Sequence, residues 1–124
     1  MFVKALCLIA LVAGSVSARQ INAAGLALIK EFEGFYPRFY KDPVGIRTIG
    51  YGHACHVNDC SKVHEPMSEA DATKLLLKDL SEYEGCIDNF VKVDDDKFAA
   101  LTSFVFNLGC SSLRSSALGA KVKV

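Results

Sequence analysis

Residues 33–53 read EGFYPRFYKDPVGIRTIGYGH, a stretch that contains Glu33, Asp42 and Thr48. Its middle part is rich in aromatic residues, turns through a proline and a glycine, and then continues as a second, more apolar run. This pattern is typical of two antiparallel strands joined by a tight turn. We therefore predict a β-hairpin with Asp42 at its bend and Thr48 on the returning strand.

An apolar helical pattern precedes the hairpin, beginning near Asn22 and ending at Glu33. Gly34 follows it, and glycine is common where a chain leaves a helix through a left-handed conformation. The carboxylate of Glu33 is therefore predicted to lie at the end of a helix, where Asp42 and Thr48 can face it.

Two carboxylates in one cleft suit glycoside hydrolysis, in which one donates a proton to the leaving oxygen and the other acts on a water or on the forming oxocarbenium ion. Phe32 and Phe35 flank Glu33, and their exclusion of water would raise its pKa. Asp42 lies in a turn with backbone donors and would stay ionised, which favours Glu33 as the acid. The spacing alone also allows a structural interpretation, with an ordinary helix end, turn residue and strand former.

The helix ending in EG, the YKD run, the turn glycine and the TIGYGH run together closely resemble the phage-type lysozymes, glycoside hydrolase family 24, which cleave the sugar backbone of peptidoglycan. The resemblance continues through DATKLLLKDL from Asp71 and DDDKFAALTSFVFNLG from Asp94. It covers the chain from about Ile21 to about Leu118. The resemblance implies an α+β class, a mainly helical lysozyme-like fold with a small antiparallel β-hairpin at the catalytic cleft.

The resemblance also implies roles for individual residues. Glu33 would be the general acid, Asp42 would position or activate the attacking water, and Thr48 would help to hold that water. The family is usually described as inverting, and no cofactor is implied. His53 closes the TIGYGH run, where it could orient a carboxylate or be purely structural.

Residues 1–18 have the features of a secretory signal: a positive charge at Lys4, an apolar run over residues 5–13 and a small-residue end at 16–18. The alternative is a buried N-terminal helix. We predict an extracellular mature protein of residues 19–124, a single catalytic domain without a membrane span.

The charge balance gives little indication of a charged partner. The full chain has 14 basic and 14 acidic residues, and removal of Lys4 with the signal leaves 13 against 14. No basic stripe suggests nucleic acid. The expected partner is bacterial peptidoglycan, bound by a monomer.

Five cysteines are present, and Cys7 lies in the predicted signal. The remaining four, in a small secreted domain, imply two disulfides with three possible pairings. We predict Cys55 with Cys60 and Cys86 with Cys110. The alternative is a zinc site formed by a cluster of histidines and cysteines. The spacing of this cluster fits no familiar zinc module, so we predict no metal. The cluster consists of His53, Cys55, His56, Cys60 and His64.

Further helices are predicted from Ser68 to about Tyr83 and over residues 98–108, the second ending at Gly109. Their apolar residues are assigned to the core, including Leu108. Three aromatic residues could line a sugar cleft, although core packing is the simpler explanation; they are Tyr83, Phe104 and Phe106.

The C-terminal part departs from the family pattern. The sequence stops at Val124, where the family continues through further helices, and residues 118–124, LGAKVKV, do not read as an amphipathic helix. We therefore expect a shortened C-terminus and an incomplete C-terminal lobe.

Two functions are consistent with the sequence. The first is a secreted, antimicrobial muramidase that hydrolyses the β-1,4 bond between N-acetylmuramic acid and N-acetylglucosamine, for defence or for feeding on bacteria. The second is a noncatalytic secreted protein, either a peptidoglycan-binding remnant or a small disulfide-stabilised domain.

Overall fold

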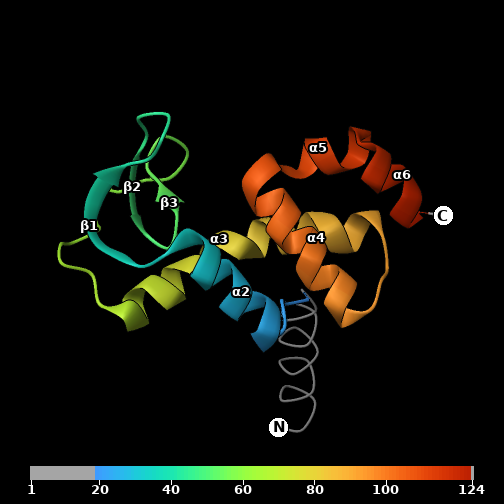
Figure 1. The fold of residues 1–124 in the computed structure, drawn as a ribbon, viewed down its shortest axis with the longest axis horizontal. Coiled ribbons are helices and arrows are strands. Elements are labelled where there is room, and N and C mark those ends of the chain that lie inside the picture. The colour runs from blue at the N-terminus through green and yellow to red at the C-terminus, as the bar shows by residue number, and fades with distance from the viewer. Residues whose placement is uncertain (1–18, 124) are drawn as a thin grey trace, which may run out of the picture.

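The computed structural model describes residues 19–123, so the predicted signal peptide and Cys7 lie outside the described residues. In Figure 1 the sheet lies at one end of the molecule, α4 to α6 lie at the other, and the long helix α3 runs between them. This arrangement has the α+β character predicted from the sequence. The elements are α2 (Ala23–Glu33), β1 (Tyr36–Lys41), β2 (Arg47–Gly50), β3 (His53–Ala54), α3 (Glu69–Phe90), α4 (Asp95–Leu108), α5 (Cys110–Ser115) and α6 (Ala117–Lys123).

Helix α2 begins and ends as predicted. The side-chain oxygen of Asn22 accepts a hydrogen bond from the backbone N–H of Gly25, with 2.9 Å between the two atoms. The helix ends where Gly34 adopts φ 74°, and the N–H of Gly34 donates to the carbonyl of Lys30. Glu33 is therefore the last residue of the helix.

The predicted hairpin is present, and a third strand extends it. Strands β1 and β2 are antiparallel, with Tyr40 opposite Thr48. Strand β2 ends at Gly50 and the chain turns into β3, which pairs with β2 on its other side. Gly50 at φ 68° and Gly52 at φ 79° permit this turn, because residues with a β-carbon rarely adopt such angles.

Helix α3 is longer than predicted. It begins at the Ser68 cap and continues past Tyr83 to Phe90. Its buried face includes Leu76, Leu80, Glu84 and Ile87, so helical spacing continues through the part that the apolar pattern alone did not reveal. A polar residue, Glu84, occupies the buried position at which the apolar pattern was interrupted.

Helix α4 follows a cap at Asp94 and ends at Gly109, which has φ 87°. Phe98, Leu101 and Val105 are buried, as predicted. The assignment of Leu108 to the core was wrong, since 58% of this residue is exposed at the last position of the helix.

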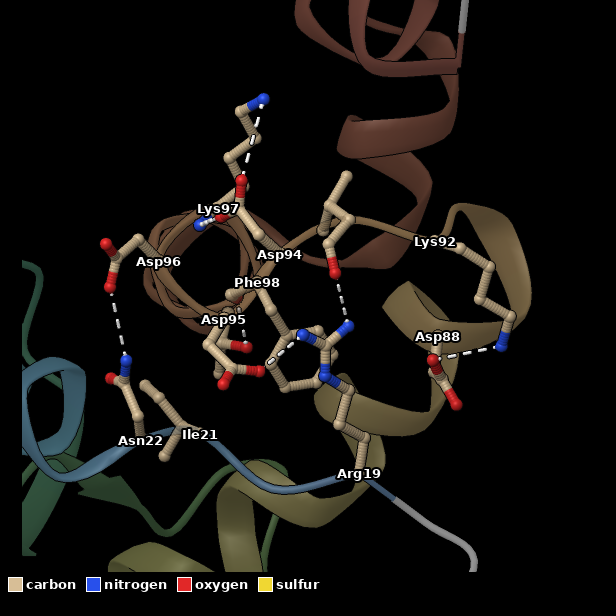
Figure 2. A network of polar contacts seen from close by, with 12 residues as sticks. Arg19, Ile21, Asn22, Asp88, Lys92, Asp94, Asp95, Asp96, Lys97 and Phe98 are labelled. Atoms are coloured by element: carbon tan, nitrogen blue, oxygen red, sulfur yellow. Dashed lines mark hydrogen bonds and ion pairs between the residues drawn. The ribbon is translucent and has the colours of Figure 1, made fainter.

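The segment that precedes α2 is attached to the helical end of the molecule (Figure 2). The guanidinium of Arg19 donates to the carbonyl of Val93 and to Asp95, both at 2.7 Å, and lies 4.3 Å from the ring centre of Phe98. The N–H of Ile21 donates to the buried carboxylate of Glu84, with 2.6 Å between nitrogen and oxygen. These contacts fix the start of the helix that ends in Glu33.

Both predicted disulfides are present, Cys55 with Cys60 and Cys86 with Cys110. Residues 118–124 do not read as an amphipathic helix, yet α6 covers Ala117–Lys123. The hydroxyl of Ser116 accepts a hydrogen bond from the N–H of Gly119 at 3.0 Å, which supports the first turn of α6 without an amphipathic pattern. Within residues 19–123 no helix combines the length and apolar character needed to cross a membrane.

Candidate active site

Glu33 and Asp42 line the same cavity, which has a volume of about 400 Å³. The end of α2 supplies Glu33 and the β1–β2 turn supplies Asp42. The opposite wall comes from α3 and from the end of α4. The two carboxylates that the sequence singled out are thus brought together, and the cavity between them and the helices is the candidate active site.

Glu33 is half-buried, and this burial raises the pKa of its carboxyl group above the ordinary value for glutamate. Gly52 contributes to this close packing. A β-carbon at position 52 would lie 2.6 Å from Oε1 of Glu33 and 3.1 Å from its Cδ. The β2–β3 turn therefore lies directly against the carboxyl group, and a side chain at position 52 would require that carboxyl group to move.

Asp42 is held by its own turn. Its Oδ1 accepts hydrogen bonds from the N–H groups of Val44 and Ile46, at 3.0 and 2.8 Å. The backbone N–H of Asp42 donates to the carbonyl of Ile46, and the N–H of Gly45 donates to the carbonyl of Asp42. These bonds fix the orientation of the carboxylate before any ligand binds.

Thr48 is buried in β2 and does not line the cavity that contains Glu33 and Asp42. Its hydroxyl donates to the carbonyl of Ile46 at 2.9 Å. Because the N–H of Ile46 donates to Asp42, Thr48 and Asp42 are linked through the same residue of the turn.

His53 contacts a carboxylate, but that of Asp79 on α3 rather than that of Glu33 or Asp42. Its Nδ1 lies 2.7 Å from Oδ2 of Asp79, and both side chains are largely buried. The Nε2 atom is buried without a hydrogen-bond partner among the described residues. Asp79 also lines the candidate cavity, whereas His53 does not, so the pair joins the sheet to the wall of the cavity.

Sequence reasoning missed the contribution of α3. Lys78, Asp79 and Glu82 all line the cavity, and Lys78 and Glu82 are four residues apart, a spacing that places them on one face of a helix. That spacing was visible in the sequence, but nothing local indicated that this face lies opposite Glu33.

Two aromatic residues that were assigned to the core also line the cavity. The rings of Tyr83 and Phe106 lie edge to face, with centres 5.9 Å apart. Both residues also pack against the hydrophobic core, so core and cleft roles are combined. The third aromatic residue, Phe104, packs against the core and does not line the cavity.

Tyr40 is a further residue near the two carboxylates. Burial raises the pKa of its phenol, and the neighbouring Tyr36, Glu33 and Asp42 raise it further. Its ring stacks on that of Tyr36, with 4.0 Å between the ring centres. The Tyr40 hydroxyl therefore stays protonated beside the candidate site.

The cysteines of the possible zinc cluster are not free thiolates, because Cys55 and Cys60 are bonded to each other. Across residues 19–123 no three His, Cys, Asp or Glu side chains are grouped so that they could hold a metal ion.

Comparison with known proteins agrees with this geometry. The profile of the phage lysozyme family matches residues 30–124. The chain is 41% identical over 103 residues to the endolysin of Bacillus phage B103, an alignment that covers 79% of this chain and 38% of the endolysin. It is 35% identical over 100 residues to the endolysin of Salmonella phage P22, covering 78% of this chain and 68% of that protein.

Among solved structures, the muramidase domain of SpmX from Asticaccaulis excentricus matches with a TM-score of 0.72 and 32% identity, over 85% of this chain and 70% of that one. The chain thus spans 38% of the length of the B103 relative and about two thirds of the P22 relative. The family profile covers most of the sequence, and both Glu33 and Asp42 lie within the matched region. The chain belongs to the phage lysozyme family.

Proposed function

We propose that this protein is a lysozyme that hydrolyses the β-1,4 bond between N-acetylmuramic acid and N-acetylglucosamine in bacterial peptidoglycan. The observation that carries this proposal is the shared cavity of Glu33 and Asp42, in which Glu33 has a raised pKa and Asp42 is held by backbone donors. The endolysin and muramidase relatives support the same activity.

Glu33 is the proton donor in this proposal. A carboxyl group with a raised pKa retains its proton closer to neutral pH, so it can donate that proton to the leaving glycosidic oxygen. The backbone at Gly52 lies beside the carboxyl group, so it restricts the positions that the carboxyl group can adopt on that side. This restraint would keep the proton directed at the scissile bond.

Asp42 positions and activates the attacking water. Its Oδ1 accepts hydrogen bonds from two backbone N–H groups, which leaves Oδ2 to accept a hydrogen bond from the water that attacks the sugar. Thr48 acts on the turn rather than on the water in this proposal. Its hydroxyl donates to the carbonyl of Ile46, whose N–H donates to Asp42, so Thr48 helps to position the Asp42 carboxylate.

The walls of the cavity suit a sugar chain. Tyr83 and Phe106 offer apolar ring surfaces, and Lys78, Glu82 and Asn107 offer polar groups. Carbohydrate rings present both C–H faces and hydroxyl edges, and a site for them needs both kinds of surface.

We further propose that residues 1–18 are a cleaved signal and that residues 19–124 act outside the cell as a monomeric antibacterial enzyme. The two disulfides support this proposal, because such bonds persist mainly in oxidising compartments.

Digestion of purified, insoluble peptidoglycan by the oxidised protein tests the proposal. We expect soluble disaccharide peptides whose N-acetylmuramic acid carries the new reducing end, identified by borohydride reduction and mass spectrometry. Glu33→Gln should abolish their release. Glu31→Gln is the matched control, because Glu31 is exposed two positions away and does not line the cavity. Binding of peptidoglycan by folded wild-type protein without release of reducing ends would instead indicate the noncatalytic function.

A further inference from the structure

Tyr51 lies in the β2–β3 turn, between Gly50 and Gly52, and belongs to the hydrophobic core. Only 4% of this residue is exposed. Its next neighbour along the chain, Gly52, is the residue whose backbone lies beside the carboxyl group of Glu33. Because Tyr51 and Gly52 share a peptide bond, a shift of Tyr51 would also move the backbone that borders Glu33.

The ring of Tyr51 packs against residues on both sides of Glu33 in the sequence. The ring of Phe35, two positions after Glu33, lies with its centre 5.6 Å from that of Tyr51. Nζ of Lys30, three positions before Glu33, lies 5.2 Å from the ring centre of Tyr51, and a cation over an aromatic ring is attracted to it. The ring is therefore held against the end of α2.

The hydroxyl of Tyr51 connects the same turn to α3. It donates a hydrogen bond to Oε2 of Glu69, the first residue of α3, with 2.9 Å between the two oxygens. Burial and the Glu69 carboxylate raise the pKa of the Tyr51 phenol, so the hydroxyl keeps the proton that it donates. The adjacent Gly50 also packs on α3, since a β-carbon at position 50 would lie 3.5 Å from that of Ala72. Tyr51 thus joins the end of α2 to the start of α3.

We propose that Tyr51 is a positioning residue for Glu33, an inference that rests on the proposed lysozyme function. The ring sets the separation between the β2–β3 turn and the end of α2, and the hydroxyl fixes the turn to α3. With the turn fixed, the backbone at Gly52 confines the Glu33 carboxyl group on one side. Tyr51 does not line the candidate cavity, so it acts through Gly52 and not by contact with the sugar.

Replacing Tyr51 removes none of the other ionisable groups around Glu33. Lys30 and Glu31 belong to the same helix as Glu33. The other groups come from the hairpin, from the loop after β3 and from α3; they are Tyr40, Asp42, His56, Lys78, Asp79, Glu82 and Tyr83. A lower pKa of Glu33 in a Tyr51 variant would therefore report greater access of water to its carboxyl group.

Steady-state kinetics on soluble peptidoglycan fragments separate positioning from binding. We expect Tyr51→Leu to lower kcat about 10- to 100-fold, since a misplacement of about 1 Å can cost about 100-fold. KM should stay close to that of wild type, because Tyr51 does not touch the substrate. The pKa that limits kcat/KM at high pH should fall, because a less confined Glu33 carboxyl group is more exposed to water.

Phe98→Leu is the matched control. Phe98 is an aromatic residue with 1% exposure in the other core cluster, away from Glu33. Its replacement should destabilise the protein to a similar extent while kcat and the pH profile stay unchanged. Both variants are compared at a temperature at which urea unfolding shows them to be folded.

A second set of variants keeps the aromatic ring and changes only the hydrogen bond. Tyr51→Phe and Glu69→Ala each remove it, and each should lower kcat about two- to tenfold, the factor that one hydrogen bond represents. The double variant should lose no more than either single variant, because both changes remove the same contact. Glu69→Gln removes the same charge from α3 as Glu69→Ala but keeps an acceptor, and it should retain the wild-type kcat.

Equal losses of kcat in Tyr51→Leu and Phe98→Leu, or in Glu69→Gln and Glu69→Ala, would overturn the inference while leaving the lysozyme function intact. Wild-type protein that releases no reducing ends would overturn the lysozyme function instead. The positioning of Glu33 is then still measured by nuclear magnetic resonance titration of its isotope-labelled carboxyl carbon. We expect a lower pKa of Glu33 in Tyr51→Leu than in wild type and Phe98→Leu, and an equal pKa in all three proteins would contradict the role of Tyr51.

Discussion

Gly52 lies so close to Glu33 that a β-carbon at position 52 would fall 2.6 Å from Oε1 of the glutamate. The same glycine adopts φ 79°, a conformation that costs other residues about 1–2 kcal/mol. Two independent features therefore favour glycine at this position: the backbone angle, and a space that a β-carbon could enter only if the Glu33 carboxyl group moved.

Gly52→Ala should consequently reduce both stability and activity. The strained backbone lowers the free energy of unfolding, and the new methyl group displaces the Glu33 carboxyl group, so we expect a loss of at least about tenfold in wall-clearing rate. Urea unfolding and turbidimetry on the same preparation measure the two effects.

Two other glycines separate these causes. Gly45 has φ 88° and open space within 4 Å of the point that a β-carbon would occupy, so Gly45→Ala carries the backbone cost alone. Gly85 lies inside α3 with open space around it, and Gly85→Ala should stabilise by about 0.5–1 kcal/mol. Equal wall-clearing rates for Gly52→Ala and Gly85→Ala would show that the contact with Glu33 has no functional effect.

Glu84 should make stability depend on pH. Burial raises the pKa of its carboxyl group, an effect only partly offset by the hydrogen bond from Ile21. The folded protein therefore binds this proton more tightly than the unfolded chain does. Glu84 is least destabilising below the pKa that it has in the unfolded chain, and the free energy of unfolding falls as pH rises through the pKa that it has in the folded protein. Glu84→Gln, which keeps an acceptor for Ile21, should remove this dependence and be more stable than wild type at neutral pH.

The comparison requires unfolding curves from about pH 4 to about pH 8, a range that begins near the ordinary glutamate pKa. Glu84→Ala is the contrasting variant. It leaves the buried N–H of Ile21 without its acceptor and should cost about 1–3 kcal/mol. Parallel pH profiles for wild type and Glu84→Gln would contradict the assignment.

The His53–Asp79 contact and the Asp88–Lys92 ion pair, each formed by an aspartate of α3, should differ in strength. Asp79 and His53 are largely buried, with 12% and 6% of their side chains exposed. Asp79→Ala would leave the buried Nδ1 of His53 without its hydrogen-bond partner and should lower the free energy of unfolding by about 1–3 kcal/mol. Asp88→Ala, which breaks the exposed pair with Lys92, should cost less than about 1 kcal/mol. Similar losses in both variants would indicate that the His53 contact is not a buried interaction in solution.

The two disulfides should also contribute unequally. Cys86–Cys110 joins residues 24 positions apart and Cys55–Cys60 joins residues 5 apart. The entropy of the unfolded chain predicts losses of about 3 and about 2 kcal/mol when each pair is replaced by serine. The shorter disulfide closes the loop that carries His56, Val57 and Asn58 of the active-site cavity, so its removal should raise KM more than removal of the longer one. A larger KM effect from the Cys86–Cys110 replacement would reverse this assignment.

The parts of the fold that depend on local rules could be predicted from the sequence. A helix that ends at Gly34 and a turn built around Asp42 follow from the conformational preferences of glycine, proline and aspartate. The pairing of Cys55 with Cys60 also connects residues close in sequence. These features place Glu33 beside the hairpin without knowledge of the remaining structure.

The other wall of the cavity could not be predicted, because it depends on contacts between distant segments. His53 and Asp79 are 26 positions apart, and Glu84 meets Ile21 across 63 positions. Tyr83 and Phe106 have an apolar pattern that fits the core, and only the packing of α3 against α4 exposes one side of each ring to the cavity. Helical spacing identifies a face, but not the surface that the face meets.

The most direct test of the account is the combined activity and stability of Glu33→Gln. Burial of Glu33 disfavours its ionised form in the folded protein and raises its pKa. The resulting loss in the free energy of unfolding is absent at low pH, where the group is protonated, and appears as pH rises through the pKa of Glu33 in the folded protein. We therefore predict that Glu33→Gln loses at least about 100-fold in wall-clearing activity while its free energy of unfolding at neutral pH equals or exceeds that of wild type. A variant that keeps its activity, or that loses activity only because it unfolds, would contradict the assignment of Glu33 as the proton donor.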